Sequence, residues 1–316
     1  MRIALIGRSE ILYDTAHALR ALGHEIAVVV TAKEAPEYTR SLEDFKQLAS
    51  ACNAPFFHAP SMQDRQAVLQ QLASLPPMDI GISYNYTGVI PQTIIDLFPL
   101  GILNAHGGDL PRYRGNACQA WAIVNGEERI GLCVHRMVGG ELDSGDIVAR
   151  EYLALVEETS ITEVVQWMGE RIPVLFTQGL SALARDPSFV VERQSTNPAD
   201  ALRCYPRKPE DGRIDWSSSA ANILRLINAS NKPYAGAFCH YEGKLMIIWK
   251  ASIIRDEERF VAVHGQVMRI GEDCIDVATG DGKLRIFTVE YDGTVGTPSA
   301  FIRSIRKRLG AGVQHA

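Results

Sequence analysis

The first half of the chain alternates between short apolar runs and longer stretches that place apolar residues at helical spacing. Apolar runs are typical of parallel strands, because a strand covered on both faces has no polar side. They predict strands over residues 2–7, 25–31, 55–60, 79–85, 101–106, 129–137 and 147–155. Helices are predicted between them over residues 14–23, 42–52, 62–75, 91–98, 116–126 and 161–186, the first burying Ala16, Leu19 and Leu22. Strands that alternate with helices predict a parallel sheet covered on both faces.

The pattern changes near residue 195. Residues 194–216 are polar and contain prolines, which predicts a linker. Beyond it, a helix is predicted over residues 220–230, and short strands over 237–254, 265–270, 274–278 and 283–291 are separated by glycine and aspartate turns. Such strands are typical of a small barrel. A last helix, over residues 300–310, is predicted to carry Arg303, Arg306, Lys307 and Arg308.

The predicted fold class is therefore α/β, with a Rossmann-like, mostly parallel sheet followed by a small OB-like β-barrel domain. We place the catalytic domain over residues 1–198 and the barrel domain over residues 199–316. A length of 316 residues agrees with two domains.

Composition narrows the class of protein. A formal net charge of -5 does not indicate a strongly basic nucleic-acid binder, although residues 199–316 are mildly basic. The six cysteines form no C-x-x-C pair and have no zinc spacing, which predicts free thiols in a reducing cytoplasm and no metal site. No signal-peptide pattern and no stretch of about 18 apolar residues is present, so we expect a cytoplasmic protein without membrane contact.

The candidate chemistry lies where the strand over residues 101–106 ends. Asn104 and His106 are two residues apart on this strand and should therefore project to the same side. The acidic loop that holds Asp143 and Asp146 offers a carboxylate as the third group of this candidate site. Asn offers an uncharged N–H donor to a developing oxyanion, His is the usual general acid or base, and a carboxylate can orient the imidazole. The chain has no Walker loop, no G-x-G-x-x-G after the first strand and no G-x-S-x-G elbow, so the set suits transfer between two bound substrates.

The stretch "LNAHGGDLPRYRGNACQAWAIVNGEERIGLCVHRMVGGELDSGDIV" resembles the folate-dependent formyltransferase family. The shared pattern is Asn-x-His, then Leu-Pro-x-x-Arg-Gly, then an Asp in a Leu-Asp-x-Gly loop. Matched residue by residue, it falls on Asn104, His106, Leu110-Pro111, Arg114-Gly115 and Asp143. The resemblance implies that Asn104, His106 and Asp143 are catalytic. The second half, with "YPRKPEDGRIDW", is similar to the barrel appended in methionyl-tRNA formyltransferases and in the enzyme that formylates a nucleotide-linked amino-arabinose.

The resemblance implies 10-formyltetrahydrofolate as the formyl donor and an amine as the acceptor. The folate contacts that it implies fall on Gly88, Val89, Ile90, Asn116, Val138, Gly139, Gly140, Leu142 and Asp143. The chain departs from the amino-arabinose enzyme at Asn116, where that relative has arginine. Gly108-Asp109 stands where the family usually has Ser-Leu.

Two acceptors remain. We favour the amine of a nucleotide-linked amino sugar, a small-molecule substrate that would imply a role in lipopolysaccharide biosynthesis. On this interpretation a nucleic-acid partner is not expected, in part because Asp109 is unhelpful beside a tRNA backbone. The alternative is methionyl initiator tRNA, which the mildly basic barrel could serve. A folate-binding regulatory protein is the interpretation without catalysis, and exposed barrel edges leave a homodimer open.

Overall fold

The computed structural model describes residues 1–60, 65–86 and 88–310. The chain divides into two compact units. Unit 1 comprises Met1–Cys118, Ile130–Leu153 and Val165–Tyr205, and unit 2 comprises Gln119–Arg129, Ala154–Val164 and the described residues from Pro206 onward. Two short segments of the first half thus belong to unit 2, and the predicted boundary between residues 198 and 199 stays a prediction.

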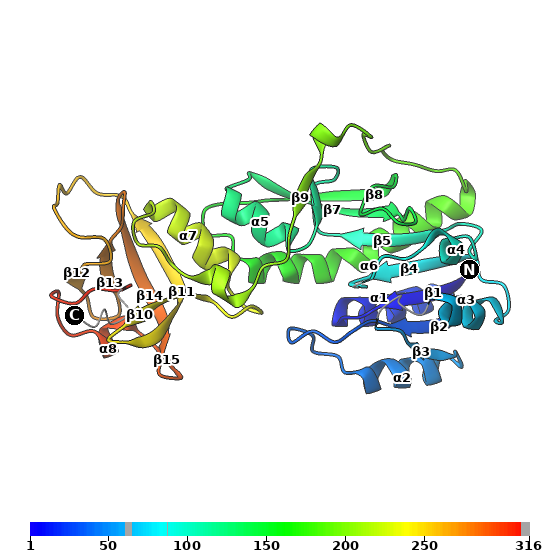
Figure 1. Ribbon diagram of the computed structural model, residues 1–316, viewed down its shortest axis with the longest axis horizontal. Coiled ribbons are helices and arrows are strands. Elements are labelled where there is room, and N and C mark those ends of the chain that lie inside the picture. Colours follow the sequence, from blue (N-terminus) through cyan, green and yellow to red (C-terminus); the bar gives the residue numbers. More distant parts are fainter. Residues whose placement is uncertain (61–64, 87, 311–316) are drawn as a thin grey trace. The chain divides into compact units, whose positions relative to one another are not determined.

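Unit 1 is built on a seven-stranded sheet in the order β3-β2-β1-β4-β5-β7-β8 (Figure 1). Neighbouring strands from β3 to β5 are parallel, and β7 runs antiparallel to β5. The strands are β1 (Arg2–Gly7), β2 (Glu25–Thr31), β3 (Phe56–His58), β4 (Ile80–Tyr84), β5 (Ile102–His106), β7 (Arg129–Arg136) and β8 (Ile147–Ala154). The predicted, mostly parallel α/β sheet is therefore confirmed.

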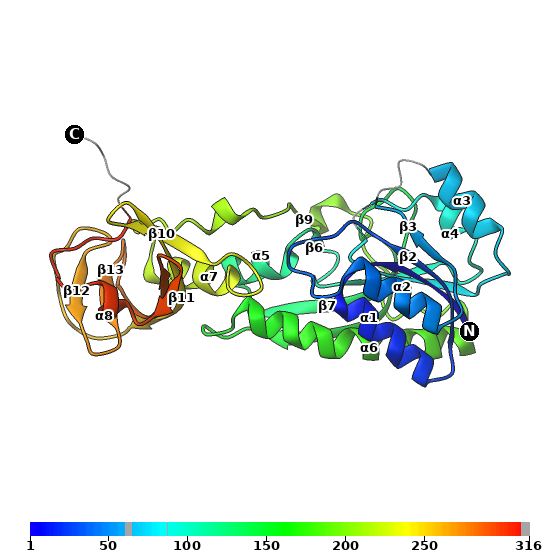
Figure 2. The ribbon, with the colours of Figure 1, turned by 90° about the horizontal axis from the view of Figure 1, so that it is seen from below.

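Helices cover both faces of this sheet. Figure 2 places α1, α2 and α6 on one side and α3 and α4 on the other. The helices of the first half are α1 (Glu10–Ala21), α2 (Leu42–Ala51), α3 (Arg65–Ala73), α4 (Gln92–Ile95), α5 (Cys118–Asn125) and α6 (Ile161–Arg185), of which α5 belongs to unit 2 apart from Cys118. Alternate residues of the strands are buried under α3 and α4, among them Ala4, Ile6 and Ile102. This two-sided burial explains why the strands are continuously apolar in sequence.

The ends of the helices follow their capping residues. Ser41 and Asp44 form a capping box that fixes the start of α2. Ser9 accepts from the backbone N–H of Leu12 at the start of α1, which ends at Ala21. Ala16 and Leu19 are buried as predicted, but Leu22 is 58% exposed. Leu22 follows the last helical residue, so it does not continue the buried stripe.

Unit 2 contains an antiparallel sheet in the order β10-β11-β14-β13-β12, with β15 paired to β14. This confirms an antiparallel sheet domain after the parallel one. The strands are β10 (Ala237–Tyr241), β11 (Lys244–Ile254), β12 (Val267–Ile270), β13 (Ile275–Ala278), β14 (Lys283–Tyr291) and β15 (Thr294–Gly296). Helix α7 (Ala220–Ala229) packs its apolar stripe, including Ile223 and Ile227, on the core of this sheet.

Two predictions for the second half are wrong. The last helix, α8, spans only Pro298–Phe301. After it, Lys307 accepts from the backbone N–H of Val267, and the N–H of Leu309 donates to Gly265, so this segment is held by the sheet instead of by helical hydrogen bonds. The predicted linker contains a strand, β9 (Leu202–Cys204), which pairs in parallel with β6 (Tyr113–Gly115). Short strands of this kind contain no run of apolar residues, so the sequence pattern does not predict them.

Candidate active site

The strand pair β5–β7 brings an amide and two imidazoles together. Asn104 and His106 lie on β5, and the antiparallel register places His135 of β7 directly opposite Asn104. The Nδ2 atom of Asn104 is 3.3 Å from Nε2 of His135. The rings of His106 and His135 meet edge to face, with centroids 6.4 Å apart. Both imidazoles are buried, so this is a polar cluster embedded in the end of the sheet.

Asp143 joins this cluster from the loop between β7 and β8. Its Oδ2 atom is 3.5 Å from Nδ1 of His106, and its Oδ1 atom is 3.5 Å from Nε2 of His135. The backbone N–H of Gly115 donates to Oδ2 at 2.9 Å. The side chain is 11% exposed. The structure therefore brings Asn104, His106 and Asp143 into one cluster, with His135 as a fourth member.

The surroundings of Asp143 favour its carboxylate. Burial by itself would raise the pKa of this carboxyl, because a charged group loses its hydration. The positive potential of His106, the hydrogen bond from His135 and the N–H of Gly115 act in the opposite direction. Together they hold the pKa of Asp143 well below its usual range. Asp143 is therefore a permanent anion between two imidazoles at neutral pH.

The other side of the His106 ring is fixed by main chain. Its Nε2 atom is 2.6 Å from the carbonyl oxygen of Tyr113. A carbonyl only accepts, so Nε2 carries a proton and Nδ1 is the ring atom that faces Asp143. Gly108 makes this contact possible: a Cβ at this position would lie 2.3 Å from the Tyr113 oxygen and 2.5 Å from Nε2.

His135 is not one of the site residues that the sequence predicts. It lies in a predicted strand, and its side chain is only 1% exposed. Its place beside Asn104 depends on the antiparallel pairing of β7 with β5. The only signal in the sequence is an imidazole near the end of a strand that precedes the acidic loop. Without the register, that signal does not distinguish a site residue from a core histidine.

The residues predicted to contact folate lie on two adjoining loops and beside β6. The backbone N–H of Gly139 donates to the side-chain oxygen of Gln92 at 2.9 Å, which fastens the loop over residues 138–143 to the start of α4 and therefore near residues 88–90. Val89 and Val138 are 47% and 37% exposed, whereas Ile90 is buried in the core. The remaining predicted folate contacts are placed only by their position in the chain. Gly88, Gly140 and Leu142 lie in the same two loops, and Asn116 follows β6.

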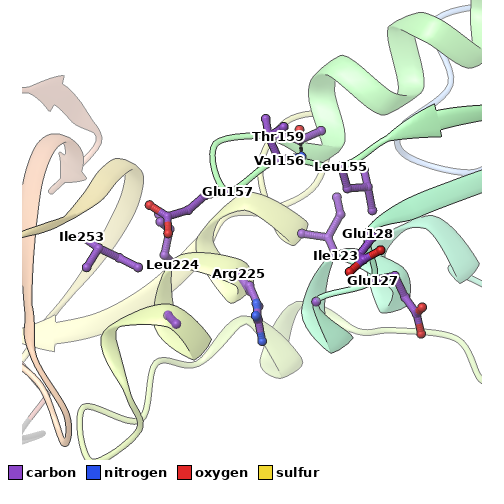
Figure 3. A pocket seen from close by; sticks show the side chains of 12 residues that line it. Ile123, Glu127, Glu128, Leu155, Val156, Glu157, Thr159, Leu224, Arg225 and Ile253 are labelled. Carbon is purple, nitrogen blue, oxygen red and sulfur yellow. Dashed lines mark hydrogen bonds between the residues drawn. The ribbon is translucent and has the colours of Figure 1, made fainter. Parts of the chain in front are cut away.

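Unit 2 has a cavity of its own, with a volume of about 230 Å³ (Figure 3). Apolar side chains line it together with three acidic residues and one basic one. The charged lining residues are Glu127, Glu128, Glu157 and Arg225. The guanidinium of Arg225 lies so close to Gly126 that a Cβ there would be 2.4 Å from it. None of the predicted site residues lines this cavity, and its acidic lining does not suit a phosphate.

Two findings limit other classes of site. In the part of the chain that the structure describes, no group of three or more His, Cys, Asp or Glu side chains is placed to hold a metal ion. Within the same residues, no helix has both the length and the apolar character needed to cross a membrane.

Comparison with known proteins identifies the family. Residues 1–176 match the formyl transferase family, and residues 207–306 match the formyl transferase C-terminal domain. The chain belongs to the formyl transferase family. It is a folate-dependent N-formyltransferase, and the formyl donor of the family is 10-formyltetrahydrofolate, as the resemblance implied.

Two of the curated relatives are methionyl-tRNA formyltransferases. Those of Pelotomaculum thermopropionicum and Alkaliphilus oremlandii are each 31% identical over 301 residues, which is 93% of this chain and 92% and 93% of theirs. Two solved structures share the fold. HypX from Aquifex aeolicus in complex with tetrahydrofolic acid has 19% identity and a TM-score of 0.62, over 96% of this chain and 47% of its own. The N-formyltransferase from Helicobacter canadensis, in complex with folinic acid and dTDP-3-aminofucose, has 14% identity and a TM-score of 0.64, over 91% and 98%.

These comparisons correct the predicted acceptor. The expectation of a nucleotide-linked amino sugar is wrong, because the formyltransferases that match at 31% identity over 93% of the chain are methionyl-tRNA enzymes. The sugar enzyme of Helicobacter canadensis is similar only in fold, at 14% identity. The predicted role in lipopolysaccharide biosynthesis depended on the sugar and has no support.

The described residues are compatible with the folate donor. The exposed apolar side chains of Val89 and Val138 belong to two adjoining loops, and Val138 lies 3.3 Å from where a Cβ on Gly145 would be, close to the turn that holds Asp143. Apolar side chains with backbone amides between them are the usual lining for a flat aromatic ligand. A Cβ at Gly140 would meet nothing within 4 Å, so this loop leaves open space at its tip.

Proposed function

We propose that this formyl transferase moves the formyl group of 10-formyltetrahydrofolate to the amine of methionyl initiator tRNA. One observation carries the proposal: identity of 31% to methionyl-tRNA formyltransferases extends over 93% of the chain, through both matched domains. The sugar enzyme of Helicobacter canadensis aligns over a similar share of the chain, 91%, but at only 14% identity.

The four-residue cluster supplies the groups that this reaction needs. The acceptor amine attacks the formyl carbon only as the free base. As the new bond forms, the bond from that carbon to N10 of the folate breaks, so the proton that the amine loses must be taken up and passed to the departing N10, which leaves as tetrahydrofolate. We assign this proton transfer to His106, whose Nδ1 atom faces the Asp143 carboxylate. The anion of Asp143 stabilises positive charge on the ring. Asn104 presents an N–H donor for the oxygen on which negative charge develops during attack.

A second cavity in unit 2 supports a polyanionic acceptor. It has a volume of about 490 Å³ and is lined by Arg213, Arg308 and His264, with Asp215 as its one acidic residue. Basic side chains around an open cavity suit contact with phosphates of a nucleic-acid backbone. The acidic cavity around Arg225 does not. We therefore assign the tRNA-contacting side of unit 2 to the residues of the second cavity.

The test is a formylation assay with 10-formyltetrahydrofolate at saturation. Methionyl initiator tRNA is the expected acceptor, and a panel of nucleotide-linked amino sugars and uncharged tRNA serve as comparators. The expected product is formyl-methionine released from the tRNA by base and identified by mass spectrometry. A formyl group found on an amino sugar but not on methionine would overturn the proposal. Asn104→Ala provides the control for transfer that does not use this site.

A further inference from the structure

Gln194 is a buried polar residue outside the family pattern. It is 7% exposed and lies after α6, where the chain runs beside the start of β8. Here the backbone N–H of Ile147 donates to the carbonyl of Glu192 at 2.8 Å, and the N–H of Val191 donates back to Ile147 at 2.8 Å. These bonds deliver Gln194 to the loop that carries Asp143.

Both polar atoms of the Gln194 side-chain amide are hydrogen-bonded. Its Nε2 atom donates to the backbone carbonyl of Asp143 at 2.9 Å and to that of Gly145 at 2.6 Å. Its Oε1 atom accepts from Nη2 of Arg114 at 2.9 Å. A primary amide offers two N–H donors and an acceptor at one point, and each of them has a partner here. Arg114 in turn fixes which way the amide points.

Asp143 needs such support, because its backbone adopts a positive φ of 49°. A residue with a Cβ is strained in this left-handed conformation and keeps it only where the surrounding structure over-determines it. The two carbonyls bound by Gln194 bracket this turn. If they were released, the turn could relax, and the carboxylate would rotate away from the imidazoles.

Strand β6 ties these contacts together. Its three successive residues hold two members of the cluster and Gln194: the Tyr113 carbonyl accepts from His106, Arg114 donates to Gln194, and the Gly115 N–H donates to Asp143. Asp143 is thus held through its side chain by Gly115 and through its main chain by Gln194.

We propose that Gln194 is a positioning residue for the formyl transfer: it holds the Asp143 turn so that the carboxylate faces both His106 and His135. It touches neither substrate in this role and acts only through Asp143. The effect on turnover rests on the proposed function, whereas the effect on the Asp143 carboxyl does not.

The first experiment compares Gln194→Met, which keeps the volume, and Gln194→Glu, which keeps the acceptor for Arg114 but loses both donors. Both should lower kcat by about 10- to 100-fold, the usual cost of losing a supporting partner of a catalytic group. KM for each substrate should change less than about twofold, because the residue acts through Asp143 and not on binding. Gln166→Ala is the matched control, since Gln166 lies on the exposed face of α6 and donates to Glu170.

The second experiment combines Gln194→Met with Asp143→Asn. If Gln194 acts through Asp143, the double variant should be no slower than Asp143→Asn alone. A further loss of the size seen in the single variant would overturn the proposal, because it would require a separate role. Wild-type kcat in both single variants would do the same.

The third experiment measures the carboxyl of Asp143 directly by NMR with carbon-13-labelled aspartate. The pKa of Asp143 should rise toward its ordinary value in Gln194→Met and stay unchanged in Gln166→Ala. This titration needs no acceptor, so it decides the positioning role even if methionyl-tRNA is not the substrate. A pKa of Asp143 that is the same in wild type and Gln194→Met would overturn the proposal.

Discussion

The Nε2 atom of His106 lies 2.6 Å from the carbonyl oxygen of Tyr113, and Gly108 leaves the space for this contact. Gly108→Ala would place a Cβ 2.5 Å from Nε2, so the imidazole or the carbonyl must move. We expect turnover to fall by about 10- to 100-fold, because displacement of a catalytic group by about 1 Å costs this much. Stability should fall as well, because the Cβ would also lie 2.3 Å from the main-chain oxygen of Tyr113. Steady-state kinetics and thermal unfolding measure the two effects.

Gly169→Ala is the control for this substitution. Gly169 lies in α6, and a Cβ there would have its nearest neighbour at 3.9 Å, an ordinary contact. It should keep wild-type turnover. Unchanged turnover in Gly108→Ala would mean that the Tyr113 carbonyl does not orient the ring that carries out the chemistry.

Asn104→Ala and His106→Ala should fold normally and lose most turnover. For Asn104 we expect a loss on the order of 10²- to 10³-fold, as for other donors to a developing oxyanion. Initial rates at saturating donor and acceptor give the size of the loss, and the urea midpoint reports the fold. Asn222→Ala, on the exposed face of α7, is the matched control. A near wild-type rate in either site variant would remove that residue from the mechanism.

Much of this arrangement follows from the sequence, because it depends on local patterns. The apolar runs of β1 and β2 identify strands buried on both faces, and the spacing of Asn104 and His106 places both side chains on one side of β5. The acidic loop after β7 supplies the aspartate. In a parallel α/β sheet, residues that follow the strands meet beyond the carboxyl ends of those strands, so their proximity can be predicted from the strand pattern alone.

The parts that could not be predicted depend on pairing between distant segments. His135 enters the site through an antiparallel register, and Gln194 reaches Asp143 from 51 positions away in the chain, in a stretch without a helix or strand. The pattern over residues 300–310 predicts a helix, but Ile302 and Leu309 enter the core of unit 2 while Ile305 is 55% exposed. The predicted acceptor is wrong because the few loop residues that favour a sugar hold less information than 31% identity over 93% of the chain.

Asp143→Asn should change how stability depends on pH. The pKa of Asp143 is depressed in the folded protein, so its ionisation stabilises the fold at any pH above the ordinary value for an aspartate. We expect the difference in free energy of unfolding between wild type and Asp143→Asn to be constant from neutral pH down to about pH 5 and to shrink steadily below about pH 4. Urea titrations of both proteins along this range measure it.

The comparison needs an aspartate outside the cluster. Asp14→Asn, on the exposed face of α1, should leave no such pH-dependent difference. If the difference for Asp143→Asn stays flat to pH 3, the carboxylate does not gain stability from the two imidazoles in the way that the geometry indicates.

We expect the basic cavity of unit 2, lined by Arg213 and Arg308, to contact tRNA and the acidic cavity around Arg225 not to contact it. Replacing both Arg213 and Arg308 by alanine should raise KM for methionyl-tRNA and reduce the dependence of log KM on log salt concentration, because fewer counterions are released when fewer phosphates are neutralised. The expected change in this slope is about one to two units for two phosphate contacts. Arg225→Ala removes one positive charge from the acidic cavity and should leave both quantities unchanged. Equal effects of Arg225→Ala and the double variant would point to general electrostatics of unit 2, and no effect of either would place the tRNA elsewhere on the protein.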